Sequence, residues 1–396
     1  MPTNDLSPGP EIRDCGLYVH IPFCETKCGY CDFFSVALKG RTTGPLVERV
    51  CRELKDRVGG CDHCVRTVFF GGGTPTILPV AELARVLETV AANVEVEELA
   101  EFTVEANPAT VEEEKARLLV QHGVTRVSMG AQSFDWAELA VLERLHSPDD
   151  IPSSVNVLRL AGIREINLDL IFGIPGQSLE SWLRSLRRAI ELGPDHIACY
   201  GLTFEPNTVL TAQMQRGRVT PCDEDLEAEM FLATIDVLGE AGYRQYEISN
   251  FARPGCESKH NLMYWRNEPY IGVGPSACGC VDGRRYKNVA DVGNYIRWMD
   301  ERGNGEADTE NLSVEAIALE AVLMQLRLNE GLSFDSFRRM TGLNFFEVFG
   351  DAPDRFAAEG LVELDDRRMA LTRNGRLVAN RVMGELAGAL NIDGGS

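Results

Sequence analysis

The chain has 396 residues, 44% of them hydrophobic, which is typical of a packed protein with one large and one smaller domain. Lys and Arg total 39 against 60 for Asp and Glu, and this net charge of -21 disfavours a nucleic-acid binder, which needs a basic surface. The N-terminus has no basic start before an apolar run, and no apolar run approaches the ~20 residues of a membrane-spanning helix. We therefore expect a cytoplasmic protein without a nucleic-acid partner, and we expect its 12 cysteines to be thiols, metal ligands or core residues.

Short runs of β-branched and aromatic residues alternate with amphipathic stretches along the first 250 residues. The alternation predicts a parallel α/β domain whose strands cover 16–23, 66–72, 101–108, 126–134, 166–175 and 196–206. Polar residues share one face of four of these runs: Tyr18 and His20, Thr103 and Glu105, Ser128 and Gln132, and Asn167 and Asp169. Strands covered by helices on both faces would be almost continuously hydrophobic. The pattern therefore favours a partial (βα)6 TIM-like barrel with a polar interior over an open sheet.

The rest of the chain has a different character. Residues 251–305 begin with turn residues and aromatics without a helical period, which predicts a connector or a site loop. Residues 306–396 predict three helices, a short hairpin and a last helix, an arrangement typical of a small winged-helix-like α+β domain. Its recognition segment would carry Asp351 and Asp354, so we expect packing or partner docking rather than DNA binding. The predicted domains are 1–250, 251–305 and 306–396.

Three cysteines follow the first predicted strand: Cys24, Cys28 and Cys31. Their spacing can hold three irons of a four-iron, four-sulfur cluster and leave the fourth iron free to bind S-adenosylmethionine (SAM). The alternative is a structural zinc site, which needs four ligands; the nearest candidates are His20, Cys61 and Cys64. Cys61 and Cys64 have a metal-like spacing of their own, but no second pair lies near them in the sequence. We therefore favour the cluster and interpret that pair as incidental.

Other candidate groups follow the later strands. The run Gly71-Gly72-Gly73-Thr74-Pro75 would let backbone approach a ligand, although a tight turn explains it equally well. Glu105 and Asp169 are barrel-facing carboxylates suited to ribose hydroxyls or an ammonium group, and a structural hydrogen bond is the alternative. Gln132 and Arg144 fit the same site, although an arginine in a helix is more often a solvated surface residue.

The motifs LYVHIPFCETKCGYCDF, FFGGGTPT, VEANP, GAQSFD, NLDLIFGIPGQ and YEISNFARPG with HNLMYW occur in this order along nearly the whole chain. In this they resemble the oxygen-independent coproporphyrinogen III dehydrogenase superfamily of radical SAM proteins, and within it the heme chaperone HemW branch. The resemblance implies a radical SAM barrel with a C-terminal cap. It implies a cluster on Cys24, Cys28 and Cys31 and a SAM site formed by Tyr18, Tyr30, Gly72, Gly73, Thr74, Glu105, Gln132, Arg144 and Asp169.

One position separates the two branches. The dehydrogenases carry a fourth cysteine two residues after the third, and this chain has Phe33 there. The resemblance therefore implies a heme chaperone that delivers heme to hemoproteins, some of them membrane-associated. The alternative is a coproporphyrinogen III dehydrogenase, so the sequence leaves open whether the protein is an enzyme. An electron donor for the cluster is expected, and homodimer formation is left open.

Candidate heme contacts lie in the segment HNLMYW. His260 is a candidate axial ligand or propionate partner, and Tyr264 and Trp265 offer aromatic faces, although such residues more often pack. The chain also departs from its relatives, with Cys278 where we expect histidine and Ser258 where some relatives have cysteine. Cys256 and Cys278 are therefore further candidate ligands.

Overall fold

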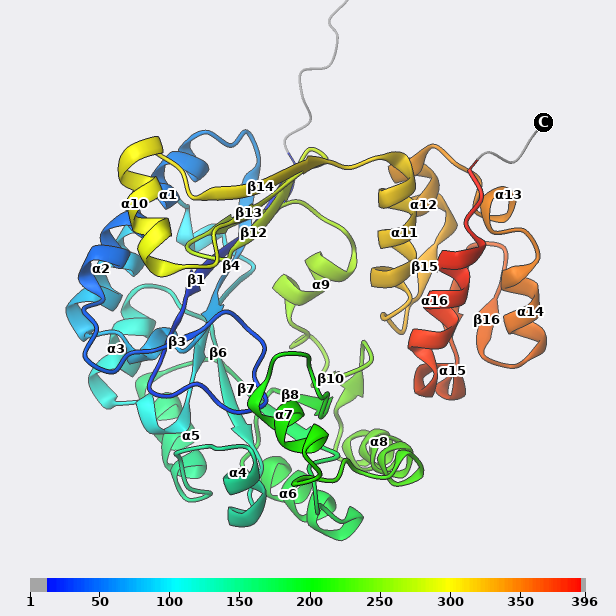
Figure 1. Ribbon diagram of the computed structural model, residues 1–396, viewed down its shortest axis with the longest axis horizontal. Coiled ribbons are helices and arrows are strands. Elements are labelled where there is room, and N and C mark those ends of the chain that lie inside the picture. The colour runs from blue at the N-terminus through cyan, green and yellow to red at the C-terminus, as the bar shows by residue number, and fades with distance from the viewer. Residues whose placement is uncertain (1–12, 393–396) are drawn as a thin grey trace, which may run out of the picture.

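The computed structural model describes residues 13–392, and its central feature is a sheet of parallel strands. Six of them lie side by side in chain order: β1 (Asp14–Ile21), β4 (Cys64–Gly72), β5 (Glu101–Ala106), β6 (Arg126–Gln132), β7 (Glu165–Phe172) and β8 (His196–Gly201). Figure 1 shows helices along the outer side of this curved sheet. The predicted α/β class and the partial six-unit barrel are confirmed.

The helices between these strands bury one apolar face against the sheet. In α6, for example, Ser178 caps the first turn while Trp182 and Leu186 are fully buried. The connecting helices are α1 (Gly44–Gly59), α2 (Val80–Ala91), α3 (Glu113–Gln121), α4 (Trp136–Val141), α5 (Asp150–Ala161) and α6 (Leu179–Glu191). After β8 come α7 (Val209–Gln215) and α8 (Glu224–Glu240). The short strands β2 (Phe23–Cys24) and β3 (Val36–Ala37) pair at the two ends of residues 24–35, which contain Cys24, Cys28 and Cys31 and are called the cysteine loop below.

The sheet extends past the barrel strands at both edges. Beside β8 lie the antiparallel strands β10 (Asn250–Ala252) and β9 (Arg244–Gln245). Beside β1 lies the parallel strand β11 (Tyr270–Val273), followed by β12 (Cys278–Val281), β13 (Arg284–Asn288) and β14 (Glu306–Asn311). Twelve strands thus form one sheet, and its two edge strands, β14 and β9, do not pair with each other.

The segment 251–305 differs from the predicted connector. Besides the added strands it contains two helices, α9 (Lys259–Trp265) and α10 (Val292–Arg302). Ser258 caps α9 by accepting a hydrogen bond from the Asn261 backbone amide, a signal that the sequence interpretation missed. The apolar residues of α10 belong to the barrel core through Tyr295 and Met299. The predicted boundaries at residues 250 and 305 stay a prediction.

The C-terminal residues form a second hydrophobic core around Phe337, Phe349 and Phe356. A three-stranded sheet in the order β15-β17-β16 lies within it. The elements are α11 (Val314–Gln325), β15 (Leu332–Ser333), α12 (Phe334–Thr341), α13 (Phe345–Phe349), α14 (Ala352–Ala358), β16 (Val362–Leu364), β17 (Arg368–Leu371), α15 (Arg373–Leu377) and α16 (Ala379–Ala389). This order is that of a winged helix, as predicted.

Helix α9 lies between the barrel and the C-terminal helices (Figure 1), where it packs against β1 and β4 on one side and α11 on the other. Within residues 13–392, no helix combines the length and the apolar character needed to cross a membrane.

Candidate functional site

The cysteine loop follows β1 and is held against the start of β3. Cys24 lies in β2, and the Cys31 amide donates a hydrogen bond to the Cys28 carbonyl oxygen at 3.2 Å, which turns the loop back. The Arg144 guanidinium donates to Cys28 Sγ at 3.5 Å, and Thr74 Oγ1 donates to Cys24 Sγ at 3.8 Å. Burial raises the pKa of the Cys24 and Cys31 thiols. A cationic and a hydroxyl donor beside the sulfurs would stabilise the thiolate form that metal binding requires.

A cavity of about 500 Å³ opens beside this loop at the carboxyl ends of the strands. All three loop cysteines line it. Of the predicted SAM residues, all but Tyr18 line it as well: Tyr30, Gly72, Gly73, Thr74, Glu105, Gln132, Arg144 and Asp169. The structure therefore brings the strand-end motifs together in one place.

Two carboxyl groups lie at the buried side of this cavity. Glu105 accepts a hydrogen bond from the Gly72 amide at 3.2 Å, and Asp169 accepts one from Asn167 at 2.6 Å. Burial, with a further contribution from Asp169, raises the pKa of Glu105 to about 8. Burial also raises the pKa of Asp169 to about 6, although the hydrogen bonds from Asn167 and Ser128 oppose the shift. A bound cation would lower both pKa values, so the pair is suited to a positively charged ligand.

The glycine run is explained by close packing. A Cβ atom on Gly73 would lie 2.5 Å from the Phe23 carbonyl oxygen, so a side chain there would displace the cysteine loop. Gly72 has φ of 103° and a Cβ there would lie 2.4 Å from the His20 ring. These glycines let the end of β4 pack directly beneath the cysteine loop.

Arg144 is not the surface residue that an isolated arginine suggests. Its guanidinium donates to Asn107 Oδ1 at 2.5 Å and to the Gly130 carbonyl oxygen at 2.8 Å, while its Nε has no partner among residues 13–392. Asn107 in turn donates to Thr74 Oγ1 at 3.0 Å, so it joins the glycine run to Arg144. Sequence reasoning did not single out Asn107, although it stands two residues after Glu105 in the motif VEANP.

Gln132 ends β6 with φ of 65°, the left-handed conformation that residues other than glycine seldom adopt. The side chain is buried and lines the cavity. Such a strained backbone persists only where the surrounding structure holds it in place, and it is found most often at binding and active sites.

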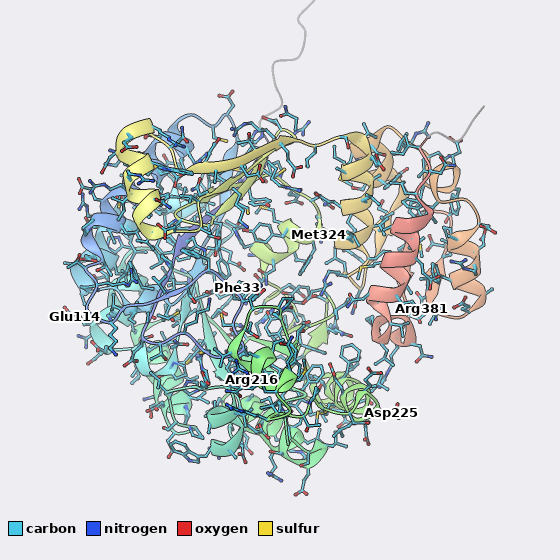
Figure 2. All side chains as sticks on the ribbon, in the orientation of Figure 1. Phe33, Glu114, Arg216, Asp225, Met324 and Arg381 are labelled. Carbon is cyan, nitrogen blue, oxygen red and sulfur yellow. The ribbon has the colours of Figure 1, made fainter. Side chains whose placement is uncertain are left out.

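A second cavity, of about 580 Å³, lies next to the first. Its walls carry aromatic side chains: Tyr18, Phe33, Phe34, Tyr200, Tyr264, Trp265 and Tyr270. They come from the barrel, the cysteine loop and the α9–β12 segment, and Met324 of α11 completes the wall. Phe33 and Tyr200 line both cavities. Figure 2 places Phe33 and Met324 in the centre of the view, between the barrel and the C-terminal helices.

Tyr18 is the predicted SAM residue that lines the second cavity and not the first. Its hydroxyl pairs with His20 Nδ1 at 3.0 Å, and His20 Nε2 pairs with the Phe34 carbonyl oxygen at 2.9 Å. Strand parity correctly predicts that Tyr18 faces inward. β11 pairs with β1 on the side away from β4, and Tyr270 of β11 lines the second cavity together with Tyr18.

His260 does not fit the predicted role of heme ligand in this structure. It is fully buried and lines neither cavity. Its Nδ1 pairs with Thr67 Oγ1 at 2.8 Å and its Nε2 with the Tyr264 hydroxyl at 3.0 Å, so both ring nitrogens are occupied. Burial lowers its pKa to about 3, which keeps the ring neutral. His260 thus positions Tyr264, which does line the second cavity together with Trp265.

The chain is similar to known proteins over nearly its whole length. The Radical SAM superfamily matches residues 18–189, and the HemN C-terminal domain matches residues 312–378. The heme chaperone HemW of Bacillus subtilis is 36% identical over 375 residues, covering 94% of this chain and 99% of that protein. HemW of Escherichia coli is also 36% identical, over 94% of this chain and 98% of that protein.

The chain belongs to the HemW family of radical SAM proteins. The solved structure of coproporphyrinogen III oxidase (HemN) from Escherichia coli has a TM-score of 0.82 and 24% identity, covering 96% of this chain and 91% of that one. That similarity establishes the shared fold.

A radical SAM family implies a four-iron, four-sulfur cluster and SAM, and the residues of this HemW protein fit both. Within residues 13–392, no three His, Cys, Asp or Glu side chains converge on one metal-ion position. A cubane does not require such convergence, because each cysteine binds a different iron. Arg144 and the two buried carboxyl groups line the same cavity as the three cysteines, so polar groups suited to SAM lie beside the predicted cluster position.

The second cysteine pair lies away from this site. Cys64 begins β4 and Cys61 precedes it, so both lie at the amino ends of the barrel strands, whereas the cysteine loop lies at the carboxyl ends. Neither lines either cavity. Cys256 also lies outside both cavities, whereas Cys278 lines the second.

Proposed function

We propose that this HemW protein is a heme chaperone, which binds heme and delivers it to hemoproteins. Its relatives in Bacillus subtilis and Escherichia coli carry that name, and the chain matches them over nearly their whole length. The observation that carries the proposal is the aromatic cavity beside the cysteine loop.

The second cavity suits a porphyrin. Its volume of about 580 Å³ lies in the range of small-molecule and cofactor sites. A porphyrin is flat and largely apolar, and the rings of Tyr264, Trp265 and Tyr270 offer faces for it to stack on. Arg327, also on the wall, provides a positive charge for a propionate.

The first cavity is the proposed site of the cluster and SAM. Cys24, Cys28 and Cys31 would hold the cluster, and the eight other predicted residues that line the cavity would contact SAM. When bound, the cluster supplies an electron that can cleave SAM to a 5'-deoxyadenosyl radical. Glu105 and Asp169 would attract the positive charge of SAM, and Arg144 would hold the cysteine loop through Cys28.

One observation favours a second candidate function, that of a coproporphyrinogen III dehydrogenase. Phe33 and Tyr200 line both cavities, so a tetrapyrrole in the second would lie close to SAM in the first. Cluster-reconstituted protein with SAM, reductant and coproporphyrinogen III, under anaerobic conditions, tests this by mass. Carbon dioxide loss over many turnovers would make the protein an enzyme. Its absence from protein with a full cluster leaves the chaperone.

The proposal includes partners that the fold alone does not identify. Delivery requires acceptor hemoproteins, some of them membrane-associated, and use of the cluster requires an electron donor. We place the protein in the cytoplasm, and homodimer formation is a further option. Size-exclusion chromatography with and without the cluster tests the dimer.

Heme binding and transfer form the direct test. Cluster-reconstituted protein is titrated with heme and the Soret band is followed, with saturation expected at one heme per chain. When apo-myoglobin is then added, heme should pass to it, and the absorption spectrum of holo-myoglobin should appear. Trp265→Ala should weaken binding, while Trp298→Ala, on α10 and outside both cavities, should not. No Soret change in the wild type would refute the proposal.

A further inference from the structure

Three residues on the wall of the second cavity carry a buried polar atom that finds no hydrogen-bond partner within residues 13–392. The atoms are Glu247 Oε2, Trp265 Nε1 and Arg327 Nε. Buried polar atoms are nearly always hydrogen-bonded, so three exceptions around one cavity need an explanation. The Arg327 guanidinium lies 5.0 Å from the Trp265 ring centroid, which places two of these groups side by side. A ligand with polar atoms at one edge would satisfy them.

Cys278 is the donor on this cavity wall best placed to bind a metal. It begins β12 and its side chain is partly buried. No hydrogen bond to its thiol is found in residues 13–392, whereas both ring nitrogens of His20, on the same wall, are engaged. Met324 brings only a neutral thioether, a weaker ligand for ferric iron than a thiolate.

The backbone fixes the position of Cys278. Across from it lies Gly272 of β11, where a Cβ atom would come 1.9 Å from the Cys278 carbonyl oxygen. Only a glycine allows this approach, so β12 packs tightly and presents the thiol to the cavity. Burial raises the pKa of Cys278, while Lys287 and Arg285 oppose the shift. An uncoordinated Cys278 is thus a thiol, and metal binding would remove its proton.

We infer that Cys278 is the axial ligand of heme in the second cavity and that Arg327 and Trp265 bind a propionate. This inference rests on the proposed function, since heme is the ligand. In the binding step the Cys278 S–H bond breaks, its proton passes to solvent, and the sulfur electron pair forms a bond to ferric iron. No electron is transferred. The Trp265 N–H and the Arg327 guanidinium donate to the propionate oxygens.

Glu247 fits the same arrangement. Its Oε1 accepts hydrogen bonds from the Ser249 amide and the Asn250 side chain, whereas Oε2 is buried and finds no partner among the described residues. Burial raises the pKa of Glu247, and a protonated carboxyl group can donate a hydrogen bond to a propionate instead of repelling it.

Spectroscopy of the heme complex tests the ligand directly. The protein is first reconstituted with its cluster, so that Cys24, Cys28 and Cys31 are occupied, and SAM is omitted. Ferric heme is added, followed by reductant and carbon monoxide. A thiolate ligand gives a strongly red-shifted Soret band in the ferrous carbonyl complex and a low-spin thiolate signal in the ferric electron paramagnetic resonance spectrum. Both are expected of the wild type.

Three variants complete the test. Cys278→Ser should lose the thiolate signals and bind heme at least about tenfold more weakly, which is ~1.4 kcal/mol. Cys280→Ser is the matched control, because Cys280 shares the strand and the strand face but does not line the cavity, and it should behave as the wild type. Cys278→His should convert the spectrum to that of a histidine ligand.

The outcomes separate the inference from the proposed function. Heme binding by the wild type without thiolate signals, or with signals that Cys278→Ser leaves unchanged, overturns the inference and leaves the chaperone function standing. A wild type that binds no heme overturns both. Because the wild-type spectrum alone reports thiolate ligation, a Cys278→Ser variant that fails to fold does not block the test.

Discussion

The two cavities of this molecule are built in different ways. The first is lined by residues at the carboxyl ends of strands that follow one another in the chain, each brought in by one short motif. The second is assembled from three parts that are far apart in the sequence: β1 with the cysteine loop that follows it, the α9–β12 segment, and α11. One contains paired carboxyl groups and the other aromatic faces.

This difference predicts independent sites that share a wall. A change in the first should abolish cluster and SAM binding and leave heme binding in place, and a change in the second should do the reverse. Phe33 and Tyr200 are the shared wall. With 68% of its surface exposed, Phe33 can move without disrupting a core.

The largest effect is expected from Cys28→Ser. The iron content of the purified variant should be nearly zero, against about four irons per chain in the wild type, because two cysteines do not hold a cubane through purification. Iron and acid-labile sulfide analysis measures this. Heme titration of the same variant should still saturate at one heme per chain. Cys222→Ser, outside both cavities, is the control. Loss of heme binding in Cys28→Ser would show that the two sites are not independent.

Arg327→Met is the corresponding change in the second cavity. It removes the proposed propionate partner, and a hydrogen bond to a charged group contributes about 1.5–3 kcal/mol, so heme affinity should fall roughly ten- to hundredfold. Heme titration measures the change, and iron content should not alter. Arg266→Met is the control, because Arg266 is exposed and pairs with Glu330 on the surface. Equal effects of the two variants would argue against a specific propionate contact.

The sequence predicted the first cavity well because its determinants are local. Hydrophobic runs located all six barrel strands, and strand parity identified Glu105 and Asp169 as inward-facing. Parity gives the face of a strand but not which cavity that face meets, so the sequence does not predict that Tyr18 lines the second cavity, and its contact with SAM stays a prediction. Asn107 was overlooked because nothing in its sequence position indicates the contact with Arg144.

The second cavity is predicted only in part: Tyr264, Trp265 and Cys278 are candidate heme contacts in the sequence and all three line it, but the elements that bring them together are not predicted. Helix α9 has only seven residues, too few for a clear period, and its Ser258 cap is a weak signal by itself. Strands β11 and β12 are rich in glycine and cysteine, so their alternation is hidden. The sequence leaves His260 open as a heme contact or a packing residue, because its partners Thr67 and Tyr264 meet it only in the folded chain.

A moderate effect is expected for the pH dependence of SAM binding. The pKa of Glu105 is raised to about 8, so the group is largely protonated at pH 6 and must ionise to pair with a cation. SAM affinity should therefore rise with pH up to about 8, by at most about tenfold per unit, with proton release on binding. Calorimetry in buffers of different ionisation enthalpy measures both.

Glu105→Gln should flatten this pH profile, and Glu205→Gln, elsewhere on the wall of the same cavity, should not. Stability should respond in the opposite direction. A carboxyl group whose pKa is raised on folding destabilises the fold progressively as the pH rises from about 4.5 to about 8. Glu105→Gln should therefore have the higher melting temperature at pH 8. A pH-independent SAM affinity in the wild type would exclude Glu105 as the cation's partner.

The smallest effect concerns how the C-terminal core is attached to the barrel. Arg373 of α15 pairs with Asp236 of α8 through two contacts of 2.7 and 2.8 Å on the surface. Because both groups are exposed, Arg373→Gln should cost roughly 0.2–1 kcal/mol, less in high salt. The pKa of Asp236 is lowered by Arg373, so this contribution is present at neutral pH and lost as the pH falls through that pKa. Because α11 lines the second cavity but not the first, a looser attachment of the C-terminal core to the barrel should weaken heme binding slightly and leave SAM binding unchanged. An equal loss of both affinities would contradict the independence of the two sites.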